Sequence, residues 1–301
     1  MDNVKNNDIK GVIGQKKVKK QIKSAILTKR HIILVGQPGI GKTTLVKALS
    51  DILPSENNKK PPFVRVQGSP DLTSEDLLGD IDPLKAIEKG PLSLEAFTPG
   101  KIFKADGGIL FFDEVNRCSE KLQNALLQAL EEKKVTIGSY DVDLNAEFIF
   151  IGTMNPEEAS TEPLSDVFLD RFDFIYMEAP ETQDFEEKIV KLKGKKIINY
   201  PDHLFKKTIK FIRNLRKDED LEKHPSVRAS IGIYERAQSN AYLENRKEVT
   251  AKDIKDSLIS VLSHRIRLKP SLKYKKTTKN YLKENFEEYF KEELTSSGDD
   301  P

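Results

Sequence analysis

A glycine-rich stretch near the start of the chain has the residue types of a phosphate-binding loop. Glycines let a backbone turn tightly, so that its N–H groups point at phosphate oxygens. Lys42 can reach the β- and γ-phosphates of ATP, and the hydroxyl of Thr43 can ligate Mg²⁺. The stretch matches the pattern G-x-x-x-x-G-K-[ST], and we expect the following residues to contact the nucleotide: Gly36, Gln37, Pro38, Gly39, Ile40, Gly41, Lys42, Thr43 and Thr44.

Two adjacent carboxylates, Asp113 and Glu114, end a second apolar run at 109–112. Such a run is typical of a strand buried on both faces of a parallel sheet, and these sheets bind ligands at the carboxyl ends of their strands. We therefore expect both carboxylates at the same edge of the sheet as the phosphate loop. There Asp113 would hold Mg²⁺, directly or through water, and Glu114 would polarise the water that attacks the γ-phosphate.

A third polar residue, Asn155, follows the apolar run 148–153 and precedes Pro156. At the end of a strand of the same sheet, its side chain would face the γ-phosphate. An asparagine before a proline is also common in turns, so the residues alone leave both interpretations open.

A parallel sheet is needed to bring these side chains together. The apolar run 31–35 precedes the loop and the helical spacing of 45–49 follows it, which is the strand–loop–helix order that the motif requires. Further strands are predicted at 63–66, 109–112, 148–153 and 175–177. The pattern indicates an α/β fold over residues 1–179, with a P-loop-type parallel sheet sandwiched by helices.

Two segments are expected to project from this sheet. Residues 72–104 begin as a helix capped by Thr73 or Ser74 and then become less regular, which we interpret as an insertion, with a plain structural loop as the alternative. Residues 135–144 are predicted to form a β-hairpin, with strands at 135–137 and 142–144 and a turn at Gly138-Ser139.

Beyond Ala179-Pro180 the chain is predicted to be helical, with no further strand after Asp184. Helices are expected at about 184–193, 202–215, 226–244 and 251–267, forming a small all-helical domain over 180–270. Residues 271–301 are predicted to hold one amphipathic helix, about 280–294, and a disordered tail. That helix either packs on the body of the protein or binds a partner.

The composition excludes several classes of site. Cys118 is the single cysteine of the 301 residues, so no intramolecular disulfide framework is present, and we interpret it as a small packing residue. The formal net charge of +2 gives no argument for binding to nucleic acid or to a membrane surface. No apolar run approaches the ~18 residues that span a bilayer. The polar start, 1–10, lacks the apolar core of a signal peptide, so we expect a cytoplasmic protein with no membrane insertion.

Taken together, the motifs resemble the AAA+ ATPases, and within them the branch of MoxR-type proteins and magnesium-chelatase I subunits. The resemblance extends over about residues 8–270. Residues 262–267 and 155–158 are more similar to the chelatase subunit, whereas 113–117 and 225–229 are more similar to MoxR. The residues that carry the resemblance are 12–15, 36–44, 97–100, 113–117, 152–158, 169–172, 228 and 262–267.

The resemblance implies roles for residues whose surroundings in the sequence say little. Asn155 resembles sensor 1, which helps to place the attacking water. Arg171 resembles the arginine finger, which enters the site of a neighbouring subunit, and Arg228 resembles sensor 2 in the helical lid. Val12 and Ile13 resemble adenine contacts.

The resemblance further implies an ATP hydrolase that forms a ring, expected to be a hexamer, and does remodelling or metal-insertion work on a protein client. It implies a separate partner with a von Willebrand factor A domain. Two alternatives stay open. A motor acting on nucleic acid is disfavoured by the acidic hairpin, which has Asp141 and Asp143 and no lysine or arginine between 135 and 144. A magnesium-chelatase ATPase subunit is the narrower alternative.

Overall fold

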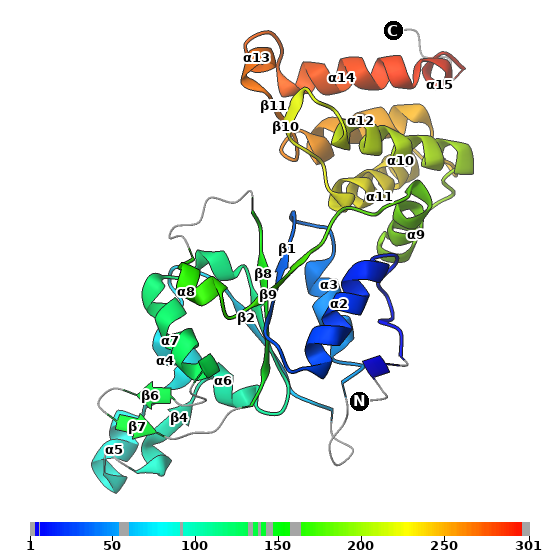
Figure 1. The fold of residues 1–301 in the computed structure, drawn as a ribbon. Coiled ribbons are helices and arrows are strands. Elements are labelled where there is room, and N and C mark those ends of the chain that lie inside the picture. Colours follow the sequence, from blue (N-terminus) through cyan, green and yellow to red (C-terminus); the bar gives the residue numbers. More distant parts are fainter. Residues whose placement is uncertain are drawn as a thin grey trace. The chain divides into compact units, whose positions relative to one another are not determined.

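The computed structural model describes residues 4–5, 7–53, 60–90, 93–131, 135–137, 140–142, 147–156 and 164–296. The chain divides into two compact units, Met1–Met177 and Glu178–Pro301 (Figure 1). The division lies close to Ala179-Pro180, where the sequence predicts a boundary. In the described part of the chain, no helix is both long and apolar enough to cross a bilayer.

The first unit is built on a sheet of five parallel strands in the order β2-β5-β8-β1-β9. The prediction of an α/β fold with a parallel sheet is therefore confirmed. The strands are β1 (Ile32–Val35), β2 (Phe63–Gln67), β5 (Ile109–Asp113), β8 (Ile149–Met154) and β9 (Asp173–Tyr176).

Helices cover both faces of this sheet (Figure 1). Side chains alternate along a strand, so that Ile32 and Leu34 of β1 belong to one core cluster, whereas Ile33 and Val35 belong to the other. Both clusters are apolar, which is why the central strands are continuous apolar runs in the sequence. The first cluster includes residues of α2 (Lys16–Leu27) and α3 (Lys42–Leu49), and the second includes residues of α4 (Ser74–Leu78), α6 (Lys101–Lys104) and α7 (Glu120–Glu131).

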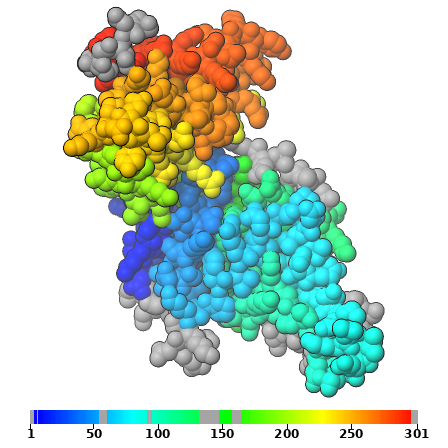
Figure 2. Space-filling model, turned by 180° about the vertical axis from the view of Figure 1, so that it is seen from behind, coloured from blue at the N-terminus to red at the C-terminus, as the bar shows by residue number. Residues whose placement is uncertain are grey.

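Within residues 72–104, helices α4 and α6 belong to the core on the sheet, and the described residues between them form a projecting β-ribbon with a helix at its end. Helix α4 begins with a capping box, in which Thr73 and Asp76 bond to each other's backbone N–H groups. Beyond α4, β3 (Gly79–Ile81) pairs antiparallel with β4 (Phe97–Pro99), and α5 (Pro83–Lys89) and the short 3₁₀ helix η1 (Leu94–Ala96) lie between them. Figure 2 shows this ribbon protruding as a lobe from the rest of the first unit.

The predicted hairpin is present, although its second strand lies earlier than expected. Strand β6 (Val135–Ile137) pairs antiparallel with β7 (Tyr140–Val142), and Ile137 lies opposite Tyr140. The turn at Gly138-Ser139 and the residues expected at the end of the second strand, 143–144, lie outside the described residues.

The second unit is helical around one apolar core, as predicted. Its helices are α9 (Gln183–Lys193), α10 (Asp202–Arg216), α11 (Val227–Leu243), α12 (Ala251–Leu262), α13 (Pro270–Lys273), α14 (Thr278–Tyr289) and α15 (Lys291–Ser296). The expectation of no strand after Asp184 is wrong at one place, where β10 (Leu221–Lys223) pairs antiparallel with β11 (Arg267–Leu268). Strands of two or three residues are too short to show an alternating pattern.

The amphipathic segment near the C-terminus packs on the second unit. Tyr281, Leu282, Phe286 and Phe290 are all buried in its core. The sequence predicts one helix over 280–294, whereas the structure has two, α14 and α15, that meet at Phe290. Residues 297–301, where a disordered tail is predicted, lie outside the described residues.

Candidate active site

The phosphate loop joins β1 to α3 and has a backbone that requires glycine at several positions. Gly39 and Gly41 have φ angles of +82° and +103°, in the region that residues with a Cβ rarely adopt. A Cβ on Gly36 would lie 2.4 Å from the carbonyl oxygen of Met177 and 2.5 Å from Cδ1 of Ile40. The glycine pattern of the sequence therefore reflects both backbone conformation and close packing.

Helix α3 begins directly after the loop, at Lys42. The Lys42 ammonium donates hydrogen bonds to the carbonyl oxygens of Gly36 and of Gln37, the latter at 3.1 Å, so that it lies over the loop. Thr43 and Thr44 follow in the first turn, where unpaired backbone N–H groups and the positive end of the helix dipole favour an anion. The loop thus combines a cation and backbone donors at one place.

Asp113 is the last residue of β5 and lies beside the start of α3. Its Oδ1 accepts a hydrogen bond from the Thr153 hydroxyl at 2.7 Å. Its Oδ2 accepts from Nη2 of Arg65 at 2.7 Å and from the Thr43 hydroxyl at 3.4 Å. A hydroxyl and a carboxylate at this separation, next to a phosphate loop, are oxygen donors of the type that Mg²⁺ binds together with phosphates. The residues present therefore fit Mg²⁺.

Glu114 follows β5 with a φ of +60°, which is uncommon for a residue other than glycine. Its N–H donates to the Thr153 hydroxyl at 2.9 Å. Its Oε2 accepts from Nε2 of Gln67 at 2.9 Å and from Nη1 of Arg117 at 3.0 Å. These contacts fix the carboxylate of Glu114 at the same edge of the sheet as Asp113, with partners of its own.

Four of these partners were not among the predicted catalytic or binding residues: Arg65, Gln67, Arg117 and Thr153. The sequence contained a signal for two of them, because Arg65 and Gln67 are alternate polar residues in a strand that is otherwise apolar. Alternation places both on the same face of β2, and Gln67 lies opposite Asp113 in the strand register.

Asn155 directly follows β8 and lies near the beginning of the phosphate loop. Met154 pairs with Val35 in the sheet, and the N–H of Gly36 donates to the carbonyl of Met154 at 3.1 Å. Asn155 is therefore positioned by the backbone at the carboxyl ends of the strands. Its orientation toward the γ-phosphate stays a prediction.

Arg171 lies at the amino ends of the parallel strands, whereas the phosphate loop lies at their carboxyl ends. It comes shortly before Asp173, which opens β9 and pairs with Ile32, the first residue of β1. The phosphate loop begins after Val35, at the other end of the same strand. The guanidinium of Arg171 pairs with Glu131 and, at 3.4 Å, with Asp170. The structure does not bring Arg171 to the phosphate loop of its own chain.

Arg228 belongs to the second unit, where it lies in the first turn of α11 with an exposed side chain. Burial and the positive charge of Arg228 lower the pKa of the Arg265 guanidinium, which donates to the carbonyl of Val261 near the end of α12. Val12, an expected adenine contact, packs against the same core cluster as Ile40, and Ile13 is half-buried beside it.

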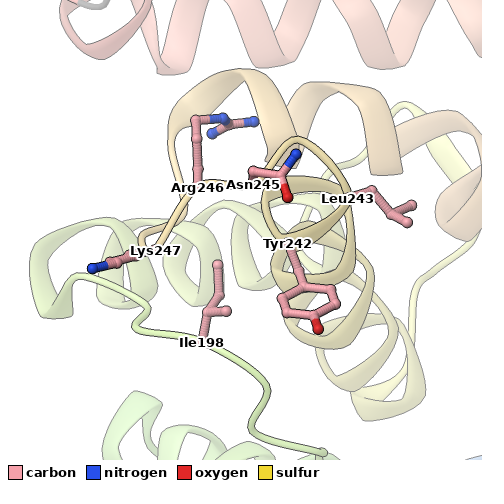
Figure 3. Close-up of a pocket in the computed structure, with 6 residues that line it drawn as sticks. All are labelled: Ile198, Tyr242, Leu243, Asn245, Arg246 and Lys247. Carbon is pink, nitrogen blue, oxygen red and sulfur yellow. The ribbon is translucent and has the colours of Figure 1, made fainter.

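Two other features carry no chemistry of this kind. Cys118 is buried, and burial raises the pKa of its thiol to about 12, so that it stays protonated and unreactive. A surface hollow of about 540 Å³ in the second unit contains none of the expected site residues. Figure 3 shows the residues that surround it, which come from the end of α11, the turn that follows it and the segment between α9 and α10: Ile198, Tyr242, Leu243, Asn245, Arg246 and Lys247.

Comparisons with known families match both units. The model described as "ATPase family associated with various cellular activities (AAA)" matches residues 31–174. The model described as "AAA lid domain" matches residues 213–283. The first match contains the phosphate loop, Asp113, Glu114 and Arg171, and the second contains Arg228.

Curated proteins with similar sequences cover most of the chain. The uncharacterized protein YeaC of Bacillus subtilis is 32% identical, over 83% of this chain and 82% of that protein. Chaperone MoxR1 of Mycobacterium tuberculosis is 26% identical, over 85% of this chain and 73% of that protein. The magnesium-chelatase subunit ChlI homolog of Methanocaldococcus jannaschii is 28% identical, over 86% and 85%.

Proposed function

Because this chain belongs to the AAA+ ATPases, in the branch of MoxR-type proteins and magnesium-chelatase I subunits, we propose that it hydrolyses ATP at the phosphate loop of its first unit. The observation that carries the proposal is the contact between the hydroxyl of Thr43 and Oδ2 of Asp113, which lie 3.4 Å apart directly beside this loop. Glu114 is held separately at the same edge of the sheet.

The chemistry of phosphoryl transfer assigns a role to each residue. Attack on the γ-phosphate passes through a loose transition state, so catalysis consists mainly of positioning and charge stabilisation. Lys42 and the backbone N–H groups of the loop bind the phosphates. Glu114 accepts the proton of the attacking water, and Asn155 helps to orient that water. Mg²⁺, held by Thr43 and Asp113, would neutralise charge on the phosphate oxygens.

The place of Arg171 supports a site shared between two chains. Members of the family form oligomeric rings. Arg171 lies at the edge of the sheet opposite to its own phosphate loop, which suits a residue that completes the site of a neighbouring subunit. We therefore propose a homo-oligomeric ring, a hexamer, with Arg171 as the arginine finger and Arg228 as a lid contact to the phosphates.

We propose that the ring remodels a protein client and acts with a separate protein that has a von Willebrand factor A domain. The relative named Chaperone MoxR1 supports the remodelling role. Helix α5 supports it too, because Leu84 and Ile87 lie on its surface 74% and 83% exposed. A magnesium-chelatase ATPase subunit remains the second candidate, supported by the similar ChlI homolog.

The substitution Glu114→Gln tests the proposed hydrolysis. It keeps the size of the side chain and the hydrogen bonds to its oxygen, but it removes the base. ATP binding, measured by equilibrium titration, should stay within about twofold of the unchanged protein, while turnover falls by about a hundredfold or more. The control is Glu88→Gln, an exposed glutamate of α5, which should leave turnover unchanged. Unaltered turnover in Glu114→Gln would contradict the proposal.

A further inference from the structure

Arg65 is a cation built into the site that the proposed reaction does not use. It lies in β2, an edge strand of the sheet, and its side chain is 45% exposed. Its Nη2 lies 2.7 Å from Oδ2 of Asp113 and 3.3 Å from Oε1 of Gln67. The strand register explains why Arg65 contacts Asp113. Gln67 lies opposite Asp113, and the side chains of Arg65 and Gln67 lie on the same face of β2.

Arg65 contacts Oδ2 of Asp113, which is the oxygen that would ligate a metal ion together with Thr43. Of the two oxygens of Asp113, Oδ1 is engaged by the hydroxyl of Thr153, and Oδ2 faces both Thr43 and Arg65. A cation held jointly by Thr43 and Asp113 needs Oδ2. A guanidinium is charged at every physiological pH, and it repels a divalent cation strongly at this distance.

We propose that Arg65 is the resident counter-ion of Asp113 and competes with Mg²⁺ for Oδ2, so that it sets the metal affinity of the site. The inference rests on the proposed function, since it takes Thr43 and Asp113 as the metal ligands. Arg65 is a positioning residue and not a catalytic one. When a metal ion takes Oδ2, the guanidinium retains Gln67 and solvent as partners, while Asp113 retains Thr153.

The chain supplies a closely matched control in Arg117. Its side chain is 46% exposed and its Nη1 lies 3.0 Å from Oε2 of Glu114. Arg65 and Arg117 thus resemble each other in exposure, charge and type of contact, but they pair with different carboxylates. A general effect of positive charge on the site would appear in both, whereas competition for Oδ2 would appear in Arg65 alone.

The test uses ADP and Mn²⁺ as probes. Binding of ADP is first measured in EDTA, and Mn²⁺ is then titrated into the ADP-bound protein, with free Mn²⁺ followed by electron paramagnetic resonance. Arg65→Gln should bind Mn²⁺ about tenfold more tightly than the unchanged protein, because a charge-assisted hydrogen bond no longer opposes the metal. Its ADP affinity in EDTA should be unchanged. Arg117→Gln should match the unchanged protein in both measurements.

Each other outcome decides against a specific claim. If Arg65→Gln binds Mn²⁺ with the same affinity as the unchanged protein, the proposed competition for Oδ2 is wrong. It is also wrong if Arg117→Gln gains as much Mn²⁺ affinity as Arg65→Gln. Weaker ADP binding in EDTA would make Arg65 a phosphate ligand instead. Absence of ADP binding in the unchanged protein would remove the proposed function itself. Arg65→Lys, which keeps the charge, should retain most of the low Mn²⁺ affinity, and a gain equal to that of Arg65→Gln would contradict the role of the charge. If Arg65→Gln fails to fold, Arg65→Ala removes the same charge and should show the same gain.

Discussion

At the scale of single residues, two consecutive carboxylates have different surroundings at one edge of the sheet. Asp113 is still part of β5 and turns its oxygens toward two threonine hydroxyls and Arg65. Glu114 already has a left-handed backbone and contacts Gln67 and Arg117. The change of backbone conformation between them gives the two carboxylates separate partners, as the roles proposed for them, one toward a metal ion and the other toward a water molecule, require.

The sequence predicts part of this site because part of it is local. Thr43 adjoins a loop with a recognisable spacing, and the rule for parallel sheets predicts that Asp113 lies near it, as the 3.4 Å contact confirms. Arg65 and Thr153 reach Asp113 from other strands. Their contribution depends on the strand order and register, which a single sequence does not specify. The catalytic roles of Glu114, Asn155 and Arg228 stay predictions.

His31 provides a prediction for pH at the same scale. Burial, with a contribution from the charge of Arg30, lowers the pKa of His31 to about 4, and its Nδ1 accepts from the N–H of Phe150 at 3.1 Å. The folded-state pKa lies below the unfolded value of about 6.5. The unfolded chain therefore binds the proton first as the pH falls, and stability is lost between about pH 6.5 and 4.

The free energy of unfolding of the first unit should be at most about 2 kcal/mol lower at pH 5 than at pH 7, measured with urea. This decrease in the free energy of unfolding is smaller to the extent that the imidazole of His31 is exposed to solvent. His31→Asn keeps an acceptor for Phe150 and removes the titration, so it should flatten this slope. Carboxylates with a lowered pKa, such as Glu186 and Asp253, lose their contribution only at lower pH. Equal slopes in the two proteins would contradict the assignment.

At the scale of elements, buried strands were the easiest to predict and short or docked elements the hardest. The central strands are apolar on both faces because helices cover both, and this makes them visible in the sequence. The pair of β10 and β11 has two or three residues in each strand and no periodicity to detect. The sequence identified the apolar face of the 280–294 segment, but not which core it meets or that it breaks at Phe290.

Docking of α14 predicts a large effect of one substitution. Phe286 is fully buried and its ring stacks on that of Phe290, with centroids 4.3 Å apart. Phe286→Ala should lower the free energy of unfolding of the second unit by about 3–5 kcal/mol, because it leaves a cavity in the core. The matched aromatic control is Tyr274→Ala, 93% exposed, which should change it by less than about 0.5 kcal/mol. Urea unfolding compares the two, and equal effects would contradict the docking.

At the scale of the whole molecule, a single chain holds the two halves of the proposed site at opposite edges of one sheet. Lys42 lies at the carboxyl ends of the parallel strands, and Arg171 lies at their amino ends. A site assembled from Lys42 of one chain and Arg171 of the next exists only in an oligomer. The rate of ATP hydrolysis would then depend on assembly of the oligomer. Two chains that are each inactive for a different reason would restore activity when they are mixed.

A mixing experiment tests this arrangement. Lys42→Ala and Arg171→Ala should each be inactive alone. In rings that mix equal amounts of both at random, about a quarter of the sites combine an intact Lys42 with an intact neighbouring Arg171, so about a quarter of the turnover should return. The control mixes each variant with a chain that carries both substitutions, which should restore nothing. Failure of the first mixture to recover turnover would place Arg171 outside the neighbouring site.

The packing of Gly36 against Met177 has a mechanical consequence. Met177 is the last residue of the first unit, its N–H donates to Val35 at 2.8 Å, and its carbonyl lies against Gly36. The backbone of the last residue of the first unit thus contacts the backbone at the start of the phosphate loop directly. A displacement of the backbone at Met177 would therefore act directly on the start of the phosphate loop.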